Sequence, residues 1–187
     1  MFIKIFIIVL WSIVLFYWGV STKRVNPDVR KIRLPLSRFF NFRNVSIVML
    51  ILELLPHGSH WIFQENNLSN TYITIGIILC VSGLTLAIWS KKSLGRNWSG
   101  SPSIRDNHSL ITSGPYKMIR HPLYAGLILT FVGLAIIGMH LYTFILVLFI
   151  GKFVAKIIIE EKLMTEKFSQ DYLDYKKQTK MIVPFVI

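Results

Sequence analysis

Long apolar blocks dominate the hydrophobic pattern of this chain, and polar residues gather in the segments between them. The blocks cover about residues 1–20, 45–63, 72–90, 124–138 and 141–159. A block of about 18 or more apolar residues is long enough to cross a bilayer core of about 30 Å as a helix. The pattern predicts an all-α fold, an integral membrane helical bundle with about five transmembrane helices.

The composition agrees with a membrane protein. Of the 187 residues, 53% are hydrophobic and only 16% are charged, whereas soluble domains carry about 25% charged residues. The first block has one charge, Lys4, and ends in Tyr17-Trp18-Gly19, a pattern typical of the membrane interface. Because its apolar stretch is longer than that of a signal peptide, we expect a retained transmembrane helix.

Ionisable residues interrupt the second block. Glu53 lies near its middle and His57 follows four residues later, on either side of Pro56. Intramembrane ionisable groups are functional by default, so a structural pair with His57 and a role in substrate access both stay open. His57 and His60 alone are too few ligands for a zinc site, and we predict no metal.

The basic residues orient the bundle. All but one of the 21 Lys and Arg residues fall in residues 21–44, 91–123 and 152–187, and the connections 64–71 and 139–140 contain none. By the positive-inside rule the N-terminus lies outside and the C-terminus is cytoplasmic. Attraction to anionic lipids accounts for the net charge of +12, so no nucleic acid partner is expected.

Two regions are expected: N-terminal transmembrane helices in residues 1–88, and a C-terminal region in residues 89–187 that contains a helical hairpin, 124–159. The single cysteine, Cys80, excludes an internal disulfide and a cysteine-based zinc site, and we expect it to be buried. The chain has no glycine-rich strand-to-helix fingerprint, which excludes a soluble Rossmann-type nucleotide site.

Candidate functional residues flank the last two apolar blocks. Arg120 and His121 precede Pro122, a residue tolerated in a first helical turn, and such a helix end offers free backbone N–H groups to a ligand. If the fifth helix continues beyond the membrane, Lys156 and Glu160 share one face at i, i+4 spacing.

An ordered set of short motifs resembles the isoprenylcysteine carboxyl methyltransferase family and its phospholipid and thiol methyltransferase relatives. The motifs are Gly114-Pro115-Tyr116, Arg120-His121-Pro122-Leu123-Tyr124, Glu160-Glu161 and Tyr172-x-x-Tyr175 with a terminal Pro184. The resemblance covers about residues 89–187, roughly half of the chain.

The resemblance implies an S-adenosyl-L-methionine pocket on the cytoplasmic side, formed by the C-terminal half. By motif position, the cofactor would be lined by His108, Ser109, Leu110, Ile111, Tyr116, His121, Pro122, Leu123, Tyr124 and Glu160. Lys156 and Arg120 are the candidate catalytic residues. Lys156 occupies the position of a substrate-contacting Arg in the eukaryotic enzymes, and keeps its charge without its bidentate geometry. An upstream Gln of those enzymes falls near Ser101.

The resulting hypothesis is an S-adenosylmethionine-dependent methyltransferase acting on an isoprenylcysteine-like or other lipophilic carboxylate. A carboxylate needs no general base, whereas an amine acceptor would need His121 or Glu161 to remove a proton. A phospholipid amine or thiol methyltransferase is the alternative within enzymes. A transporter or receptor subunit is the alternative from another class, and would spread polar residues through repeated halves.

Overall fold

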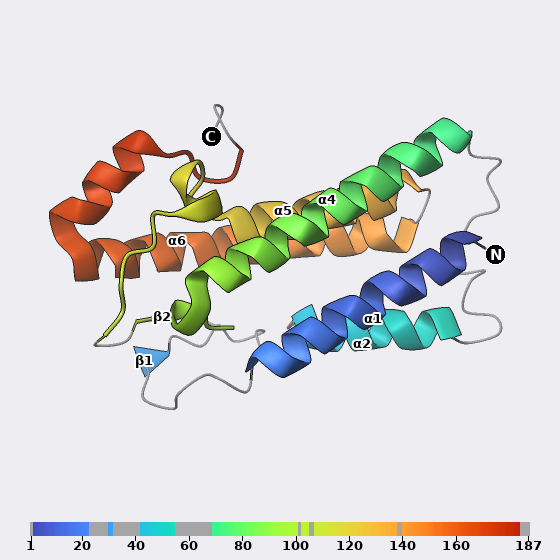
Figure 1. Cartoon of the computed structure of the whole chain (residues 1–187), viewed down its shortest axis with the longest axis horizontal. Coiled ribbons are helices and arrows are strands. Elements are labelled where there is room, and N and C mark those ends of the chain that lie inside the picture. Colours follow the sequence, from blue (N-terminus) through green and yellow to red (C-terminus); the bar gives the residue numbers. More distant parts are fainter. Residues whose placement is uncertain are drawn as a thin grey trace.

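Helices make up nearly all of the fold, in a computed structural model that describes residues 2–22, 30–31, 42–54, 69–100, 102–104, 107–137 and 140–183. The long helices are α1 (Phe2–Thr22), α2 (Phe42–Leu54), α4 (Asn70–Leu94), α5 (Pro122–Ile136) and α6 (His140–Gln178). Helices α4, α5 and α6 run alongside one another, and α1 lies against α2 (Figure 1). The predicted all-α membrane bundle is confirmed.

Three helices of the described part, α1, α4 and α6, are long and apolar enough to cross a membrane. Helix α5 has 15 residues and is about 22 Å long at 1.5 Å per residue, less than a bilayer core of about 30 Å. The second half of the second predicted span, with His57 and His60, lies outside the described residues. The count of five transmembrane helices therefore stays a prediction.

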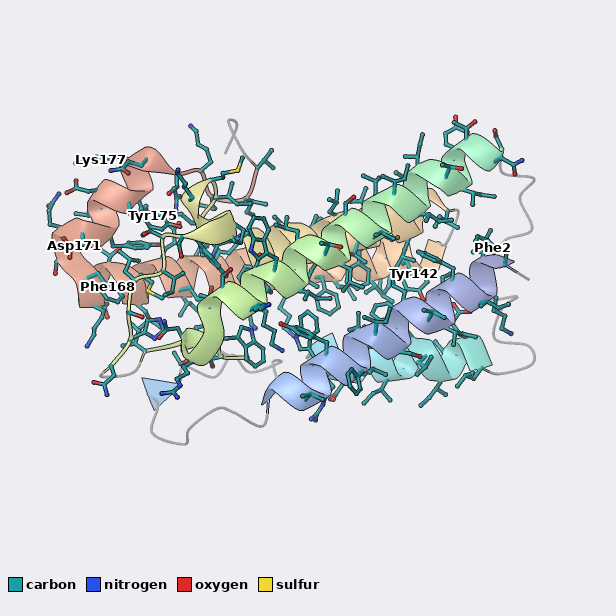
Figure 2. The ribbon with its side chains drawn as sticks, viewed as in Figure 1. Phe2, Tyr142, Phe168, Asp171, Tyr175 and Lys177 are labelled. Carbon is teal, nitrogen blue, oxygen red and sulfur yellow. The ribbon has the colours of Figure 1, made fainter. Side chains whose placement is uncertain are left out.

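Helix α6 continues beyond its apolar part, which was the condition for Lys156 and Glu160 to share one face, and then reverses. It joins two helices across a kink at Ser169, where φ is 47° and ψ is −117°. Gly95, which ends α4, has nearly the same angles, but a positive φ is uncommon for a residue with a side chain. Residues 170–178 turn back along the earlier part of α6 (Figure 1). Phe168, Asp171, Tyr175 and Lys177 mark this end of the molecule, opposite the end that carries Phe2 and Tyr142 (Figure 2).

Two short strands form the one paired sheet of the described residues, and the sequence pattern did not predict them. Strand β1 (Arg30–Lys31) pairs antiparallel with β2 (Ser103–Ile104). Short 3-10 helices η2 (Gly95–Asn97) and η3 (Gly114–Lys117) lie in the connector between α4 and α5. Strands of two residues have no measurable alternation of polar and apolar positions.

Helices α4 and α5 approach each other closely through small side chains. The contact faces carry Gly76, Cys80, Gly83 and Ala87 on α4 and Gly126, Thr130 and Gly133 on α5. A Cβ atom added to Gly83 would lie 2.6 Å from the carbonyl oxygen of Gly126, and one added to Gly126 would lie 2.6 Å from the carbonyl oxygen of Gly83. Membrane helices use such small-residue faces to bring their backbones together.

Aromatic side chains join α1 to the hairpin of α5 and α6. The Trp11 indole N–H donates a hydrogen bond to the Tyr142 hydroxyl at 2.9 Å, and the Trp11 ring packs against Phe131. Glu53 of α2 is fully buried, and its proposed partner His57 lies outside the described residues. Cys80 is buried as predicted, with its thiol directed at the Thr130 carbonyl.

Gly83→Ala should destabilise the fold, because its new methyl group meets backbone atoms of α5 that cannot move without separating the helices. Overpacking of this kind costs about 1–3 kcal/mol. Thermal unfolding in detergent, followed with a thiol-reactive dye on Cys80, measures the effect. Gly151→Ala is the matched control, since nothing lies within 4 Å of its added Cβ. Equal unfolding temperatures for the two variants would contradict the proposed packing.

Candidate functional site

The segment before α5 pairs with the segment after α6. The backbone N–H groups of Arg120 and His121 donate to the carbonyl oxygens of Lys180 and Met181 at 2.8 and 3.0 Å. The backbone donors of Arg120 and His121, just before α5, are therefore already used, and the expectation of free N–H groups in the first turn of α5 stays a prediction. Pro122 begins α5, as predicted, and His121 stands at the cap position without a side-chain capping bond.

Glu161 is the centre of an ion-pair network. Its Oε1 lies 2.7 Å from Nε of Arg120 and its Oε2 lies 2.7 Å from Nζ of Lys176. The Arg120 guanidinium also donates to the Thr179 carbonyl oxygen at 2.6 Å. Arg120, a candidate catalytic residue, thus links the start of α5 to Glu161 in the long first part of α6. It also reaches Thr179, which directly follows the part of α6 after the Ser169 kink, residues 170–178, called here the returning helix.

Three basic side chains set the charge state of Glu161, which lies beyond the apolar part of α6. Burial alone would raise the pKa of this carboxyl, but the neighbouring His121, Lys176 and Arg120 side chains outweigh it and hold the pKa well below its usual range. Glu161 therefore stays ionised at neutral pH, and its charge is already neutralised within the protein.

Glu160 has a different environment from its neighbour. The Tyr124 hydroxyl donates a hydrogen bond to Glu160 Oε1 at 2.6 Å, and His121 Nδ1 lies 3.7 Å from Glu160 Oε2. The His121 ring stacks on Tyr124, which stacks in turn on Phe153. The Glu160 side chain is 24% exposed against 11% for Glu161. The structure thus brings two predicted cofactor residues, His121 and Tyr124, next to the partly accessible carboxylate of a third, Glu160.

Tyr116 belongs to the same end of the bundle. Its carbonyl oxygen accepts a hydrogen bond from the Tyr175 hydroxyl at 2.7 Å, so η3 is fastened to the returning helix. Burial, with a smaller effect of the Glu160 charge, raises the pKa of the Tyr116 phenol. Tyr116 is therefore a neutral hydrogen-bonding group at neutral pH.

The predicted cofactor segment 108–111 lies against other parts of the fold. Asn97 of η2 donates to the Ser109 hydroxyl at 2.8 Å and accepts from the Ser109 backbone N–H at 3.5 Å. The buried His108 ring packs near Phe168 of α6. Leu110 and Ile111 are half-buried. Asn97 holds this segment in place and was not among the predicted site residues, although it lies in the polar stretch that follows α4.

Lys156 and Glu160 share a face of α6, as their spacing predicted. The Lys156 ammonium donates to the Gly100 carbonyl oxygen at 2.7 Å, so it reaches the connector between α4 and α5. Leu123, the remaining predicted residue, is half-buried in the first turn of α5.

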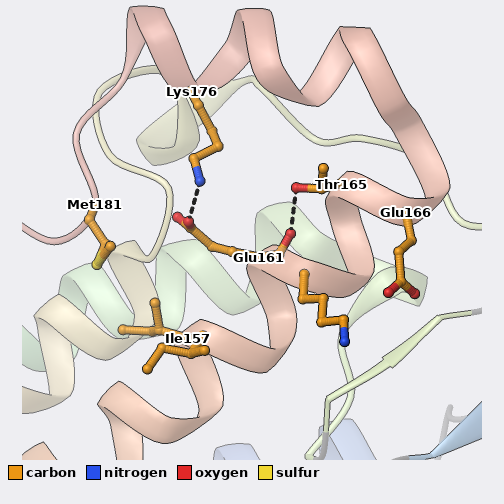
Figure 3. A pocket seen from close by; sticks show the side chains of 8 residues that line it. Ile157, Glu161, Thr165, Glu166, Lys176 and Met181 are labelled. Atoms are coloured by element: carbon orange, nitrogen blue, oxygen red, sulfur yellow. Dashed lines mark hydrogen bonds and ion pairs between the residues drawn. The ribbon is translucent and has the colours of Figure 1, made fainter.

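A cavity of about 400 Å³ lies between α6 and the returning helix (Figure 3). It is lined by Ile157, Ile158, Glu161, Lys162, Thr165, Glu166, Lys176 and Met181. None of the predicted cofactor residues lines this cavity, because it opens on the Lys176 side of Glu161, whereas Glu160 points to Tyr124.

Glu161→Gln should lower the free energy of unfolding by about 3 kcal/mol, since removal of one partner leaves the buried Arg120 charge uncompensated. Thermal unfolding of the purified protein measures the change. Asp174→Asn is the control: it removes an acid from an exposed pair with Lys177 and should leave the unfolding temperature unchanged. A Glu161→Gln protein as stable as this control would mean that the network does not hold the site together.

Comparison with known proteins places these residues in a family. Residues 71–171 match the model of the family described as phospholipid methyltransferase. The protein-S-isoprenylcysteine O-methyltransferase of Tribolium castaneum is 31% identical over 119 residues, which are 60% of this chain and 41% of that protein. Protein-S-isoprenylcysteine O-methyltransferase B of Arabidopsis thaliana is 29% identical over 159 residues, 82% of this chain and 80% of that protein.

A solved structure is also similar, that of the eukaryotic intramembrane Ras methyltransferase, isoprenylcysteine carboxyl methyltransferase. The TM-score is 0.52 at 26% sequence identity, over 81% of this chain and 50% of that chain. This chain thus spans half or less of the solved structure and of the beetle protein. The family match contains every predicted site residue from His108 to Glu160. The chain belongs to the phospholipid methyltransferase family, and its relatives include the isoprenylcysteine carboxyl methyltransferases that its motifs resemble.

Proposed function

We propose that this chain is an integral membrane methyltransferase that uses S-adenosylmethionine and methylates a lipophilic carboxylate of the isoprenylcysteine type. The observation that carries the proposal is the convergence of Tyr124 and Glu160, 2.6 Å apart, within the family-matched region. The relatives named protein-S-isoprenylcysteine O-methyltransferase support the choice of acceptor.

The residues around Glu160 fit the proposed cofactor. A half-buried carboxylate suits the ammonium or hydroxyl donors of S-adenosylmethionine, and the stacked rings of His121, Tyr124 and Phe153 offer aromatic faces. His121 Nε2 is buried and makes no hydrogen bond within the described residues, although Glu161 Oε1 lies 3.5 Å away. Glu160, His121 and Tyr124 would hold the cofactor, which supplies an electrophilic methyl group when bound.

The reaction asks for alignment rather than for a strong base. The acceptor carboxylate, ionised at neutral pH, would take the methyl group that the cofactor supplies, so no residue of this chain would need to act as a base. Because such a transfer would neutralise opposite charges, a site poor in water would favour it. The protein would hold the acceptor and the cofactor in line, and such alignment can remove a large part of the activation barrier.

Lys156 would hold the acceptor carboxylate. It stands one helical turn, about 6 Å along the axis, before Glu160 on the same face of α6. The Lys156 ammonium uses one of its donors on Gly100, and an ammonium has three. A cation at this position leaves a lipophilic acid with its carboxylate at the membrane boundary and its chain in the bilayer.

The proposed orientation has residues 91–123 and the returning helix in the cytoplasm, following the distribution of Lys and Arg. In a Cys80→Ala background, a cysteine in place of the exposed Lys177 should react with an impermeant reagent only from the cytoplasmic side. A cysteine in place of the exposed Asn70, at the other end of the bundle, should react only from outside. The opposite pattern would invert the arrangement.

Glu160→Ala should weaken S-adenosylmethionine binding by about tenfold, because loss of a buried hydrogen-bond partner costs about 1–3 kcal/mol. Calorimetry on the purified protein measures the affinity. Glu166→Ala removes an exposed acid from the same helix and should leave the affinity unchanged. Wild-type affinity in both Glu160→Ala and His121→Ala would end the cofactor proposal.

Lys156→Met keeps the apolar stem and removes the charge, so turnover of a carboxylate acceptor should fall at least about tenfold, or about 1.4 kcal/mol of transition-state stabilisation. Lys156→Arg should retain activity, since a guanidinium can bind a carboxylate through two parallel bonds. The control is Lys162→Met, an exposed lysine of α6. Assays with radiolabelled S-adenosylmethionine compare prenylcysteine, phosphatidylethanolamine and alkyl thiols. Undiminished turnover by Lys156→Met on its best acceptor would favour the amine or thiol alternative.

A further inference from the structure

A buried lysine joins α1 to the connector between α4 and α5. Lys91, in the last turn of α4, is 3% exposed. Its Nζ lies 3.7 Å from the ring centroid of Trp98, 4.3 Å from that of Trp18 and 5.2 Å from that of Tyr17. The ammonium makes no hydrogen bond within the described residues. These three rings are therefore its principal described partners.

The rings come from two separate parts of the chain. Tyr17 and Trp18 lie near the end of α1, and the Tyr17 hydroxyl also donates to the Ile88 carbonyl oxygen of α4 at 3.2 Å. Trp98 follows η2 in the connector. A cation shared among aromatic faces is attracted most strongly when it is shielded from water, so Lys91 draws Trp98 toward α1.

The connector that Lys91 holds is the one that carries the proposed cofactor and acceptor contacts. Asn97, next to Trp98, makes both hydrogen bonds to Ser109. Gly100, two residues further, receives the Lys156 ammonium. The pairing of β1 with β2 ties the same connector to the segment that follows α1. The N-terminal part of the chain thus fastens the connector at two places.

We propose that Lys91 is a positioning residue for the cofactor site. Helix α1 contributes to that site indirectly, because Tyr17 and Trp18 hold Lys91 and Lys91 holds Trp98. Helix α1 lies outside the family-matched residues 71–171, so motif comparison alone assigns it no role. The proposal rests on the proposed function, because the segment that it positions is the proposed cofactor segment. Movement of Trp98 would displace Asn97 and, through it, Ser109.

The test compares Lys91→Met with Lys92→Met, a matched exposed lysine in the same helical turn, and with Lys91→Arg, which keeps a cation. One readout is the affinity for S-adenosylmethionine. The other is the rate at which an arginine-specific protease cuts after Arg96 in the full-length protein, with fragments identified by mass. Lys91→Met should weaken cofactor affinity at least about threefold, the smaller end of the effect of one cation–π contact. The protease should also cut this variant after Arg96 faster than it cuts the wild type. Lys91→Met should also raise the KM for S-adenosylmethionine more than it lowers kcat.

Lys91→Arg and Lys92→Met should match the wild type in both readouts. Trp18→Leu, which changes α1 alone, should show the same changes as Lys91→Met. In the double variant Lys91→Met, Trp18→Leu, the loss of affinity and the faster cutting should not exceed those of the more affected single variant. Equal behaviour of Lys91→Met and Lys92→Met, or additive losses in the double variant, would overturn the proposal. If Lys91→Met does not fold, Trp98→Leu must show the same losses in the same readouts.

The two proposals fail in different ways. If the wild-type protein binds no S-adenosylmethionine, the proposed function falls, while the protease measurement still decides whether Lys91 holds the connector. If the wild type binds the cofactor and Lys91→Met changes neither readout, only the positioning role of Lys91 falls.

Discussion

The rest of the structure depends on the direct backbone contact between α4 and α5. At Gly83 and Gly126 the two helices leave no room for a side chain on either face. The contact fixes where α5 begins relative to the end of α4, and therefore how the intervening connector must run. Because α6 begins at His140, shortly after α5 ends at Ile136, and packs on α5, the face that carries Lys156 and Glu160 is placed by the same contact.

Two adjacent acids on α6 then take different tasks. Glu161 is surrounded by Arg120, Lys176 and His121 and has a structural role, since these neighbours compensate its charge. Glu160, one position on, points to Tyr124 and keeps part of its surface open. A step of one residue turns a helix by about 100°, which is enough to separate a structural carboxylate from one that is available to a ligand.

Much of this arrangement could be predicted from the sequence, because its signals are local. Long apolar blocks gave the helices, and the spacing of Lys156 and Glu160 gave their common face. The small-residue spacing of Gly76, Cys80, Gly83 and Ala87 was also present in the sequence, but it is a packing signal that length and hydropathy do not reveal. The backbone carbonyl partners of Arg120 could not be found, because a reversal of the chain at Ser169 brings them back to it. Serine carries no signal for such a turn. The contact of Lys91 with Trp18 could not be predicted either, because it joins residues from different helices.

The pairing of Arg120 and His121 with residues 176–181 has a consequence for how the protein is made. These partners lie some sixty positions later in the chain, from the last turn of α6 onward. During synthesis, α5 therefore leaves the ribosome with a guanidinium at its entrance and no acceptor for it. That charge stays in the aqueous phase until α6 has been inserted and the returning helix has folded back. The proposed cofactor site is thus completed after membrane insertion, so the bundle is embedded in the bilayer before it becomes competent to bind.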